Sequence, residues 1–199
     1  MPAQAPIEKH PFVPFLPEGA RMLFLGSFPP QLHRWSMPFY YPNWINDFWR
    51  IMGLIHFGDK DYFCIPSEKR FDEAAIRQFC LEEGLAFYDT ACEVRRLKDN
   101  ASDAFLEVVT PTDIRSLLAH IPGCRNLITT GEKATGVVAE QLGCPVPTIG
   151  AYIEVAGSVP GMADGMSGPA LRFWRMPSTS RAYPLPLDRK AAFYQRLFT

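Results

Sequence analysis

The sequence lacks the features that mark membrane and secreted proteins. None of its apolar runs approaches the roughly 20 residues needed to cross a bilayer. Its first residues, MPAQAPIEKH, contain neither the basic segment nor the apolar segment of a signal peptide. We therefore expect a cytoplasmic protein. With 199 residues, 47% of them hydrophobic, the chain can bury one sizeable core, so we expect a single domain over residues 1–199.

Paired cysteines are also absent. The five cysteines are widely spaced, with no CxxC pair and no histidine at the spacing of a zinc ligand. This pattern predicts neither a metal site nor a disulfide framework, because isolated cysteines usually behave as small hydrophobic residues. No cofactor is expected.

The composition shows no excess of positive charge, which nucleic-acid-binding domains usually carry. There are 20 Lys and Arg against 21 Asp and Glu, for a net charge of −1. The distribution is uneven, because only one acid, Asp188, follows Leu171. The basic residues of that segment are Arg172, Arg175, Arg181, Arg189, Lys190 and Arg196. They predict either a local basic face or the solvated side of a helix and a strand edge.

Short apolar segments alternate with segments of helical periodicity. The apolar segments, each followed by a small or turn-forming residue, predict strands at residues 22–25, 85–88, 126–130 and 171–176. Helices are expected at residues 71–83, 113–120, 132–142 and 188–198. A further helix is expected where Ile45, Phe48, Met52 and Ile55 share one face. This alternation predicts an α/β fold with a mostly parallel sheet and helices on both faces, and ligands bind such sheets beyond the carboxyl ends of the strands.

Two stretches rich in proline or glycine lie outside this pattern. Five prolines in residues 1–19 predict an extended N-terminal arm. Residues 145–170 predict a long surface excursion or a hairpin.

Two aromatic-rich segments follow the first predicted strand, GSFPP at residues 26–30 and FYYPNWINDFW at residues 39–49. Aromatic faces can hold a flat heterocycle by stacking. Phe48 is expected in the core, whereas Tyr40 and Tyr41 belong either to the core or to a pocket rim. Asn43 is placed to cap the helix, which leaves Asn46 as the functional candidate.

The segment after the last predicted strand reads MPSTSRAY at residues 176–183. Its short hydroxyl side chains and Arg181 suit phosphate oxygens. A helix cap or a turn stabilised by Ser or Thr explains the same residues.

In order and register, these segments together with TTGEKA at residues 129–134 resemble the uracil-DNA glycosylase superfamily. They look closest to its hypoxanthine-DNA glycosylase-like branch and related uncharacterised bacterial proteins, and the resemblance runs from about Met22 to Phe198. It implies a three-layer α/β/α fold around a central four-stranded, mostly parallel sheet.

The resemblance also implies roles for residues near the first strand. The backbone of Gly26 and Ser27 would line the base pocket. Phe28 stands where well-known members carry an acidic or amide side chain, so the usual water-activating group is replaced. Asn46 matches an asparagine associated with activity in the hypoxanthine branch, where an amide can orient water or hydrogen-bond the departing base.

Further roles follow for the other loops. Asp89 matches the residue that reads the base edge, although a helix cap or a salt bridge with Arg95 or Arg96 would also explain it. Gly131 and Lys133 belong to a turn that contacts DNA phosphate. Met176 replaces the usual histidine, and Arg181 is expected to wedge into the DNA stack. The expected DNA-binding loop comprises Ser178, Thr179, Ser180 and Arg181.

The sequence therefore predicts a monomeric, monofunctional DNA glycosylase of base excision repair. It would flip a deaminated base, uracil or hypoxanthine, out of DNA and hydrolyse its N-glycosidic bond, with the base held by Phe28, Tyr40 and Tyr41. Two alternatives remain: a catalytically silent DNA- or nucleotide-binding protein, and an enzyme acting on a small nucleoside. Neither a metal nor an iron-sulfur cluster is expected, because the cysteine spacing does not fit one.

Overall fold

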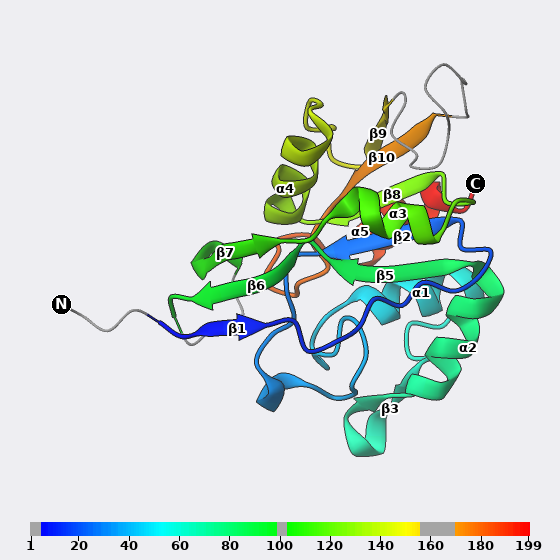
Figure 1. The fold of residues 1–199 in the computed structure, drawn as a ribbon. Coiled ribbons are helices and arrows are strands. Elements are labelled where there is room, and N and C mark those ends of the chain that lie inside the picture. The colour runs from blue at the N-terminus through cyan, green and yellow to red at the C-terminus, as the bar shows by residue number, and fades with distance from the viewer. Residues whose placement is uncertain (1–4, 99–102, 156–169) are drawn as a thin grey trace.

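The structure, a computed structural model, describes residues 5–98, 103–155 and 170–199. Its centre is a five-stranded sheet of order β5-β2-β8-β10-β9 (Figure 1). The strands are β2 (Met22–Gly26), β5 (Leu85–Asp89), β8 (Asn126–Thr130), β9 (Ala151–Val155) and β10 (Leu171–Met176). The four predicted strands all pair in parallel, which confirms the predicted fold class.

The fifth strand comes from the Gly- and Pro-rich stretch. β9 pairs antiparallel with β10 at the edge of the sheet, with Tyr152 opposite Trp174. The predicted hairpin or excursion is thus in part a strand, and residues 156–169 lie outside the described residues.

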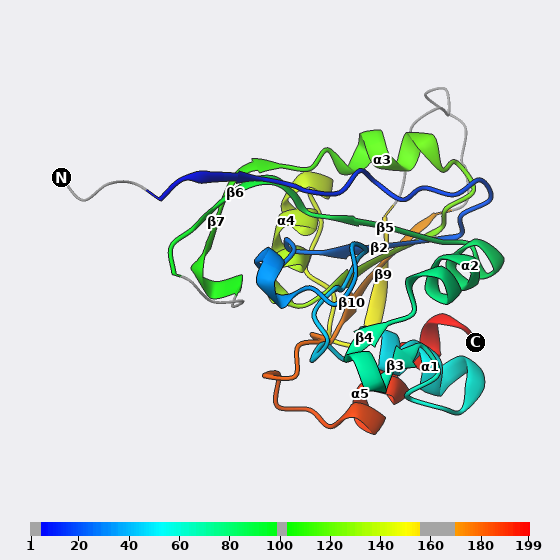
Figure 2. The ribbon, with the colours of Figure 1, turned by 90° about the horizontal axis from the view of Figure 1, so that it is seen from below.

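Five helices cover the sheet: α1 (Phe48–Phe57), α2 (Glu73–Glu83), α3 (Ile114–His120), α4 (Glu132–Leu142) and α5 (Leu187–Tyr194). The chain passes from β2 to β5 in one direction and from β5 to β8 in the other. Because such crossovers are right-handed, the two connections place their helices on opposite faces. Figure 2 shows α3 and α4 on one face and α1 and α5 on the other.

The helix starts show how the sequence fixes these boundaries. Asp72 and Asp113 cap α2 and α3, because each side chain accepts a hydrogen bond from the backbone N–H three residues later. Past α5, the predicted helix over residues 188–198 ends in a 3-10 turn, η4 (Gln195–Leu197).

The predicted start of α1 is wrong. Ile45 lies before the helix and is 50% exposed, whereas Phe48, the first helical residue, is fully buried. Asn46 Oδ1 accepts a hydrogen bond of 2.9 Å from the Phe48 N–H. Asn43 Oδ1 instead accepts one of 3.2 Å from the Ile45 N–H, within a turn. The predicted cap at Asn43 is therefore wrong: Asn46 bonds the first N–H of α1, and the residue at the N-cap position, Asp47, makes no side-chain cap bond.

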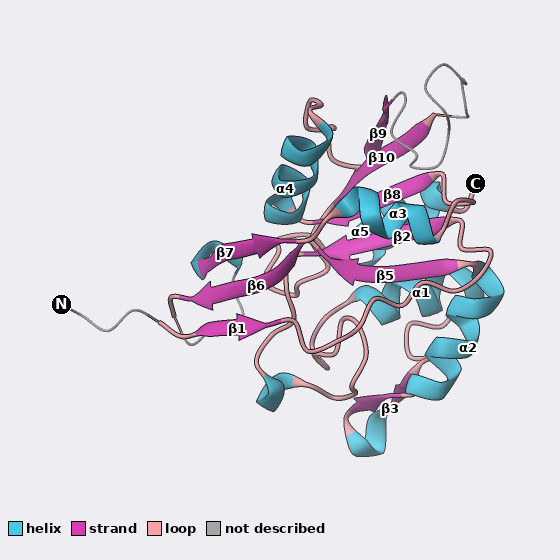
Figure 3. Ribbon diagram, in the orientation of Figure 1, coloured by secondary structure: helices cyan, strands magenta, loops and turns pink. Residues whose placement is uncertain are grey.

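A second, three-stranded antiparallel sheet projects from the domain (Figure 3). It contains β1 (Ile7–Lys9), β6 (Ala91–Arg96) and β7 (Leu106–Pro111). The N-terminal arm is extended from residue 5 onward, but β1 pairs with β6, and Phe15 exchanges backbone hydrogen bonds with Phe87 in β5. The described part of the arm is therefore bound to the domain both at β1 and at Phe15.

Short elements complete the fold. β3 (Cys64–Ile65) and β4 (Arg70–Phe71) form a two-stranded sheet before α2. Single 3-10 turns are η1 (Leu32–Arg34), η2 (Pro66–Glu68) and η3 (Asp103–Phe105). All five cysteines are free thiols. Across the described ranges, no helix is long and apolar enough to cross a membrane, and no group of three or more potential metal ligands comes together.

Candidate active site

A cleft of about 760 Å³ opens at the carboxyl ends of the parallel strands. The chain leaves β2 toward α1 on one face of the sheet and leaves β8 toward α4 on the other, so the two loops diverge. Such a divergence creates a crevice at the strand ends, where α/β proteins bind their ligands. The cleft is lined at the strand ends by Gly26, Asp89 and Thr130, the last residues of β2, β5 and β8, and by Ser178 just after β10.

Asp89, the last residue of β5, presents a nearly buried carboxylate to the cleft. Its Oδ2 lies 2.9 Å from Nε2 of His10, and the two side chains are 10% and 2% exposed. The other ring nitrogen of His10 contacts backbone atoms of Phe12, and the ring packs 4.5 Å from that of Tyr88. His10 comes from the N-terminal arm, so the predicted partners of Asp89, Arg95 and Arg96, are wrong; they pair with Glu107 and Glu8.

Gly26 makes room for this carboxylate. A β-carbon at Gly26 would lie only 2.6 Å from Asp89 Oδ1. Within the described part of the chain, no group donates a hydrogen bond to Oδ1. One oxygen of Asp89 is thus fixed by His10, and the other is left for a ligand.

A second carboxylate reaches the cleft from the start of η3. Asp103 Oδ2 accepts a hydrogen bond of 2.8 Å from Ser27 Oγ. Burial raises the pKa of Asp103, the charge of Asp89 raises it further, and the Ser27 hydrogen bond opposes both effects. Asp103 carries no recognisable signal in the sequence, because it belongs to neither conspicuous loop.

Aromatic side chains form one wall of the cleft. Tyr41 has a left-handed backbone, with φ of 53°, and its ring stacks on Phe48 with a centroid separation of 4.0 Å. Its hydroxyl lies 2.9 Å from Thr130 Oγ1. Strained backbone of this kind is concentrated at functional sites. Tyr40 lines the cleft but is 3% exposed and donates its hydroxyl to Val13 O, so it is also a core residue.

Phe28 is half-buried and also lines the cleft, with its ring 5.3 Å from that of His10. It packs against the small apolar cluster of β6 and β7. Phe28, which stands where an acidic or amide side chain was expected from the resemblance, therefore adds apolar surface to the cleft.

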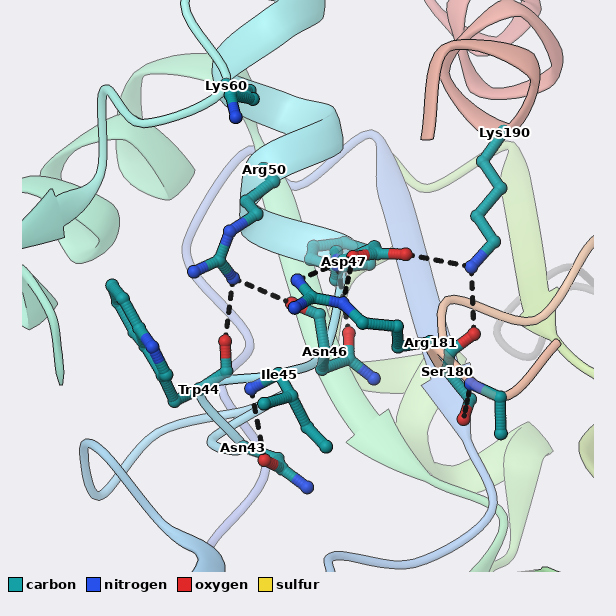
Figure 4. A network of polar contacts seen from close by, with 12 residues as sticks. Asn43, Trp44, Ile45, Asn46, Asp47, Arg50, Lys60, Ser180, Arg181 and Lys190 are labelled. Atoms are coloured by element: carbon teal, nitrogen blue, oxygen red, sulfur yellow. Dashed lines mark hydrogen bonds and ion pairs between the residues drawn. The ribbon is translucent and has the colours of Figure 1, made fainter. Parts of the chain in front are cut away.

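Asn46 also lines the cleft, although its Oδ1 accepts the hydrogen bond from the Phe48 N–H. The segment around it is held by Arg50, whose Nη1 donates to the carbonyls of Trp44 and Asn46 at 2.7 and 3.2 Å (Figure 4). The guanidinium also stacks over the Trp44 ring. Asn46 is therefore fixed in position, with its Nδ2 amide group as the donor left for a ligand.

The loop after β10 is anchored through Asp47. Lys190 Nζ donates to Asp47 Oδ2 and to Ser180 O, both at 2.8 Å, and Arg181 Nη2 donates to Asp47 Oδ1 at 3.2 Å (Figure 4). The Asp47 N–H donates to Thr179 O. These contacts join the loop to the start of α1.

The structure brings the residues of the closing loop to the cleft. Ser178, Thr179, Ser180 and Arg181 all line it. Ser178 Oγ and Ser180 Oγ accept from backbone N–H groups two residues later, so the turns that the sequence offered as an alternative are present. Among the described basic residues after Leu171, Arg181 lines the cleft and the others do not. Lys190 is instead buried against Asp47.

Gly131 and Lys133 are not among the residues that line the cleft. The Gly131 N–H donates to Met176 O, and Lys133 Nζ donates to Leu106 O. Met176 itself is fully buried. The Gly131 N–H therefore already has a hydrogen-bond partner. Glu132, which lies between Gly131 and Lys133 in the sequence, is exposed and lines the cleft.

Comparison with known proteins bears on the fold. No protein-family model matches the chain, and no curated protein matches it. Among solved structures, the chain is similar to the solution NMR structure of a "putative Uracil DNA glycosylase" from Methanosarcina acetivorans. The match covers 96% of both chains, with 18% identity and a TM-score of 0.59. The chain has the uracil-DNA-glycosylase-like fold.

Within this uracil-DNA-glycosylase-like fold, the structure brings together most of the residues expected at the site. Gly26, Ser27, Phe28, Tyr40, Tyr41, Asn46 and Asp89 share one cleft with the closing loop. His10 and Asp103 were missed. A lone histidine in a proline-rich arm carries no recognisable signal, and only the pairing of β1 with β6 brings it to Asp89.

Proposed function

We propose that this protein is a DNA glycosylase that hydrolyses the N-glycosidic bond of a deaminated base, uracil or hypoxanthine. The observation that carries the proposal is the Asp89 carboxylate at the end of β5, which lines the cleft, is held by His10 through Oδ2 and has no hydrogen bond at Oδ1 from the described residues. The similarity in fold to a structure described as a uracil DNA glycosylase supports the same reaction class.

The chemistry of Asp89 favours deaminated bases. An ionised carboxylate only accepts hydrogen bonds. Uracil and hypoxanthine carry an N–H on the ring edge where cytosine and adenine carry an acceptor nitrogen. Asp89 would therefore hydrogen-bond the ring N–H of uracil or hypoxanthine and would face an acceptor nitrogen in cytosine or adenine, the bases from which they arise.

The rest of the cleft suits an extruded nucleotide. Phe28 and Tyr41 offer apolar and aromatic surface for a flat base, and stacking contributes about 1–3 kcal/mol per base. Arg34 and Arg181 also line the cleft, and the half-exposed guanidinium of Arg181 can approach phosphate oxygens. A base in a mismatch costs least to extrude, so mispaired uracil and hypoxanthine would be captured preferentially.

Asn46 is proposed to orient water or the departing base through Nδ2, because Oδ1 is occupied by the Phe48 N–H. An amide cannot remove a proton at neutral pH, so Asn46 is a positioning group.

The test is release of base from labelled duplexes that carry one deoxyuridine, deoxyinosine or deoxyxanthosine, with abasic sites revealed by alkali. We expect release from the wild type and a loss of about 100-fold or more in Asp89→Asn. Asn46→Ser keeps an oxygen that can accept from the Phe48 N–H but removes the amide donor, so this variant should be slower while remaining folded. The exposed substitution Asp188→Asn is the matched control.

Two results would contradict the proposal in different ways. Binding to the duplexes with no release would indicate a silent DNA-binding protein. Cleavage of free nucleosides, with rates that hardly change with salt, would indicate a small-molecule enzyme, because DNA binding falls steeply as salt rises.

A further inference from the structure

The proposed reaction needs a group that takes a proton from water, and the loop after β2 does not supply it. Phe28 is apolar, and Asn46 is an amide. Two carboxylates, Asp89 and Asp103, reach the cleft from its inner side, and exposed Glu132 stands at its edge. Because one oxygen of Asp89 is held by His10 and the other is assigned to the base edge, Asp89 is already occupied.

We propose that Asp103, held by Ser27, is the carboxylate that activates the hydrolytic water. Its carboxylate accepts a hydrogen bond from the Ser27 hydroxyl through Oδ2, and its side chain lines the cleft. The inference rests on the proposed glycosylase function and adds a catalytic residue to it. Asp103 reaches the site from the segment between β6 and β7 rather than from the loop after β2.

The step is balanced as follows. The water oxygen forms a bond to C1′ of the deoxyribose while the bond from C1′ to the base nitrogen breaks, and its electron pair leaves with the base. One proton of the water passes to Asp103. The base departs as an anion and takes up a proton from solvent. Asp103 afterwards releases to solvent the proton that it took from the water.

The surroundings of Asp103 suit a general base. Burial raises the pKa of its carboxyl, and the charge of Asp89 raises it further; Ser27, Lys133 and Arg96 act in the opposite direction. A carboxylate with a raised pKa is a stronger base than an exposed one, while it still ionises as the pH increases. The hydroxyl of Ser27 orients the group without neutralising it.

The experiment measures single-turnover base release as a function of pH for the wild type, Asp103→Asn and Ser27→Ala, on the duplex that the wild type cleaves. Asp103→Asn keeps the size of the side chain and an acceptor for Ser27. We expect its rate to fall by about 100-fold or more. Its binding to a duplex with 2′-fluoro-deoxyuridine, which resists cleavage, should stay within about 3-fold of the wild type.

Ser27→Ala tests the role in a second way. Removing the hydrogen bond that lowers the Asp103 pKa should move the acid limb of the rate profile to higher pH. A purely structural role for Asp103 would leave that limb in place.

Three outcomes overturn the inference. An Asp103→Asn rate within about 3-fold of the wild type shows that no proton goes to Asp103. Equal losses of rate and of binding show a structural role. A wild type that releases no base from any duplex removes the proposed function itself, and this inference with it; in the first two cases the wild type remains active and the proposed function stands.

Discussion

Lys190 donates a hydrogen bond of 2.8 Å to Asp47, although the two side chains are only 1% and 8% exposed. This buried ion pair joins α5 to the residue before α1. Removing one partner of a buried pair leaves an uncompensated charge, which typically costs about 3–5 kcal/mol. Arg181, half-exposed, stays on the other oxygen of Asp47 and reduces that cost.

Lys190→Met is therefore expected to lower the free energy of unfolding by about 3 kcal/mol. Urea denaturation measures it. Arg189→Met, at an exposed position of the same helix, should change the value by less than about 0.5 kcal/mol. Equal stability of the two variants would show that the pair does not hold the closing loop.

Gly26→Ala should disturb the site directly. The added methyl group would lie 2.6 Å from Asp89 Oδ1, so the carboxylate must turn away from His10. We expect a loss of about 1–3 kcal/mol in stability together with weaker base release. Gly136→Ala in α4 meets nothing within 4 Å and should instead stabilise the helix by about 0.5–1 kcal/mol. An unaltered rate in Gly26→Ala would contradict the role given to Asp89.

His10→Leu should detach Asp89 from the N-terminal arm. A hydrogen bond to a charged group contributes about 1.5–3 kcal/mol, so unfolding should become easier by that amount. The preference for deaminated over normal bases should fall, as measured in single-turnover release. His10→Gln retains an N–H donor and should recover part of the stability and part of the preference for deaminated bases. His33→Leu, at an exposed position, serves as the control.

Asp103→Asn should stabilise the protein at neutral pH while it removes activity. The folded-state pKa of Asp103 is raised, so folding is favoured when the group is protonated, and that advantage is lost as the pH rises through the folded-state pKa. The midpoint of thermal unfolding should then exceed that of the wild type at pH 7. The difference should shrink below about pH 4, where the carboxyl is protonated in both states. A constant difference across this range would argue against a buried, costly carboxylate.

Local sequence signals were sufficient for most of the fold. The four parallel strands are buried along nearly their whole length, so they stand out as short apolar runs ended by Gly, Asp or Pro. The start of α1 was misjudged because Ile45 continues the apolar spacing of the helix. The hydrogen bond from the Phe48 N–H to Asn46 decides where the helix begins, and periodicity does not report it.

The site was predicted where its residues lie in conspicuous loops, and it was missed where distant segments meet. Asp89 and Asn46 follow or precede recognisable elements. His10, the partner of Asp89, is 79 residues away from it along the chain, and Ser27 and Asp103 are 76 residues apart. Contacts at such separations depend on the pairing of β1, β6 and β7, whose alternation of buried and exposed residues is too irregular to read from the sequence.

The contacts of His10 and Lys190 have a consequence for synthesis of the protein. The cleft needs the histidine of the arm, the carboxylates of the middle segments and the lysine that anchors the closing loop. During translation, a nascent chain that has emerged only as far as β8 would hold Asp89 and His10 but no closing loop. The proposed activity should therefore arise only once α5 has been synthesised and has packed against α1.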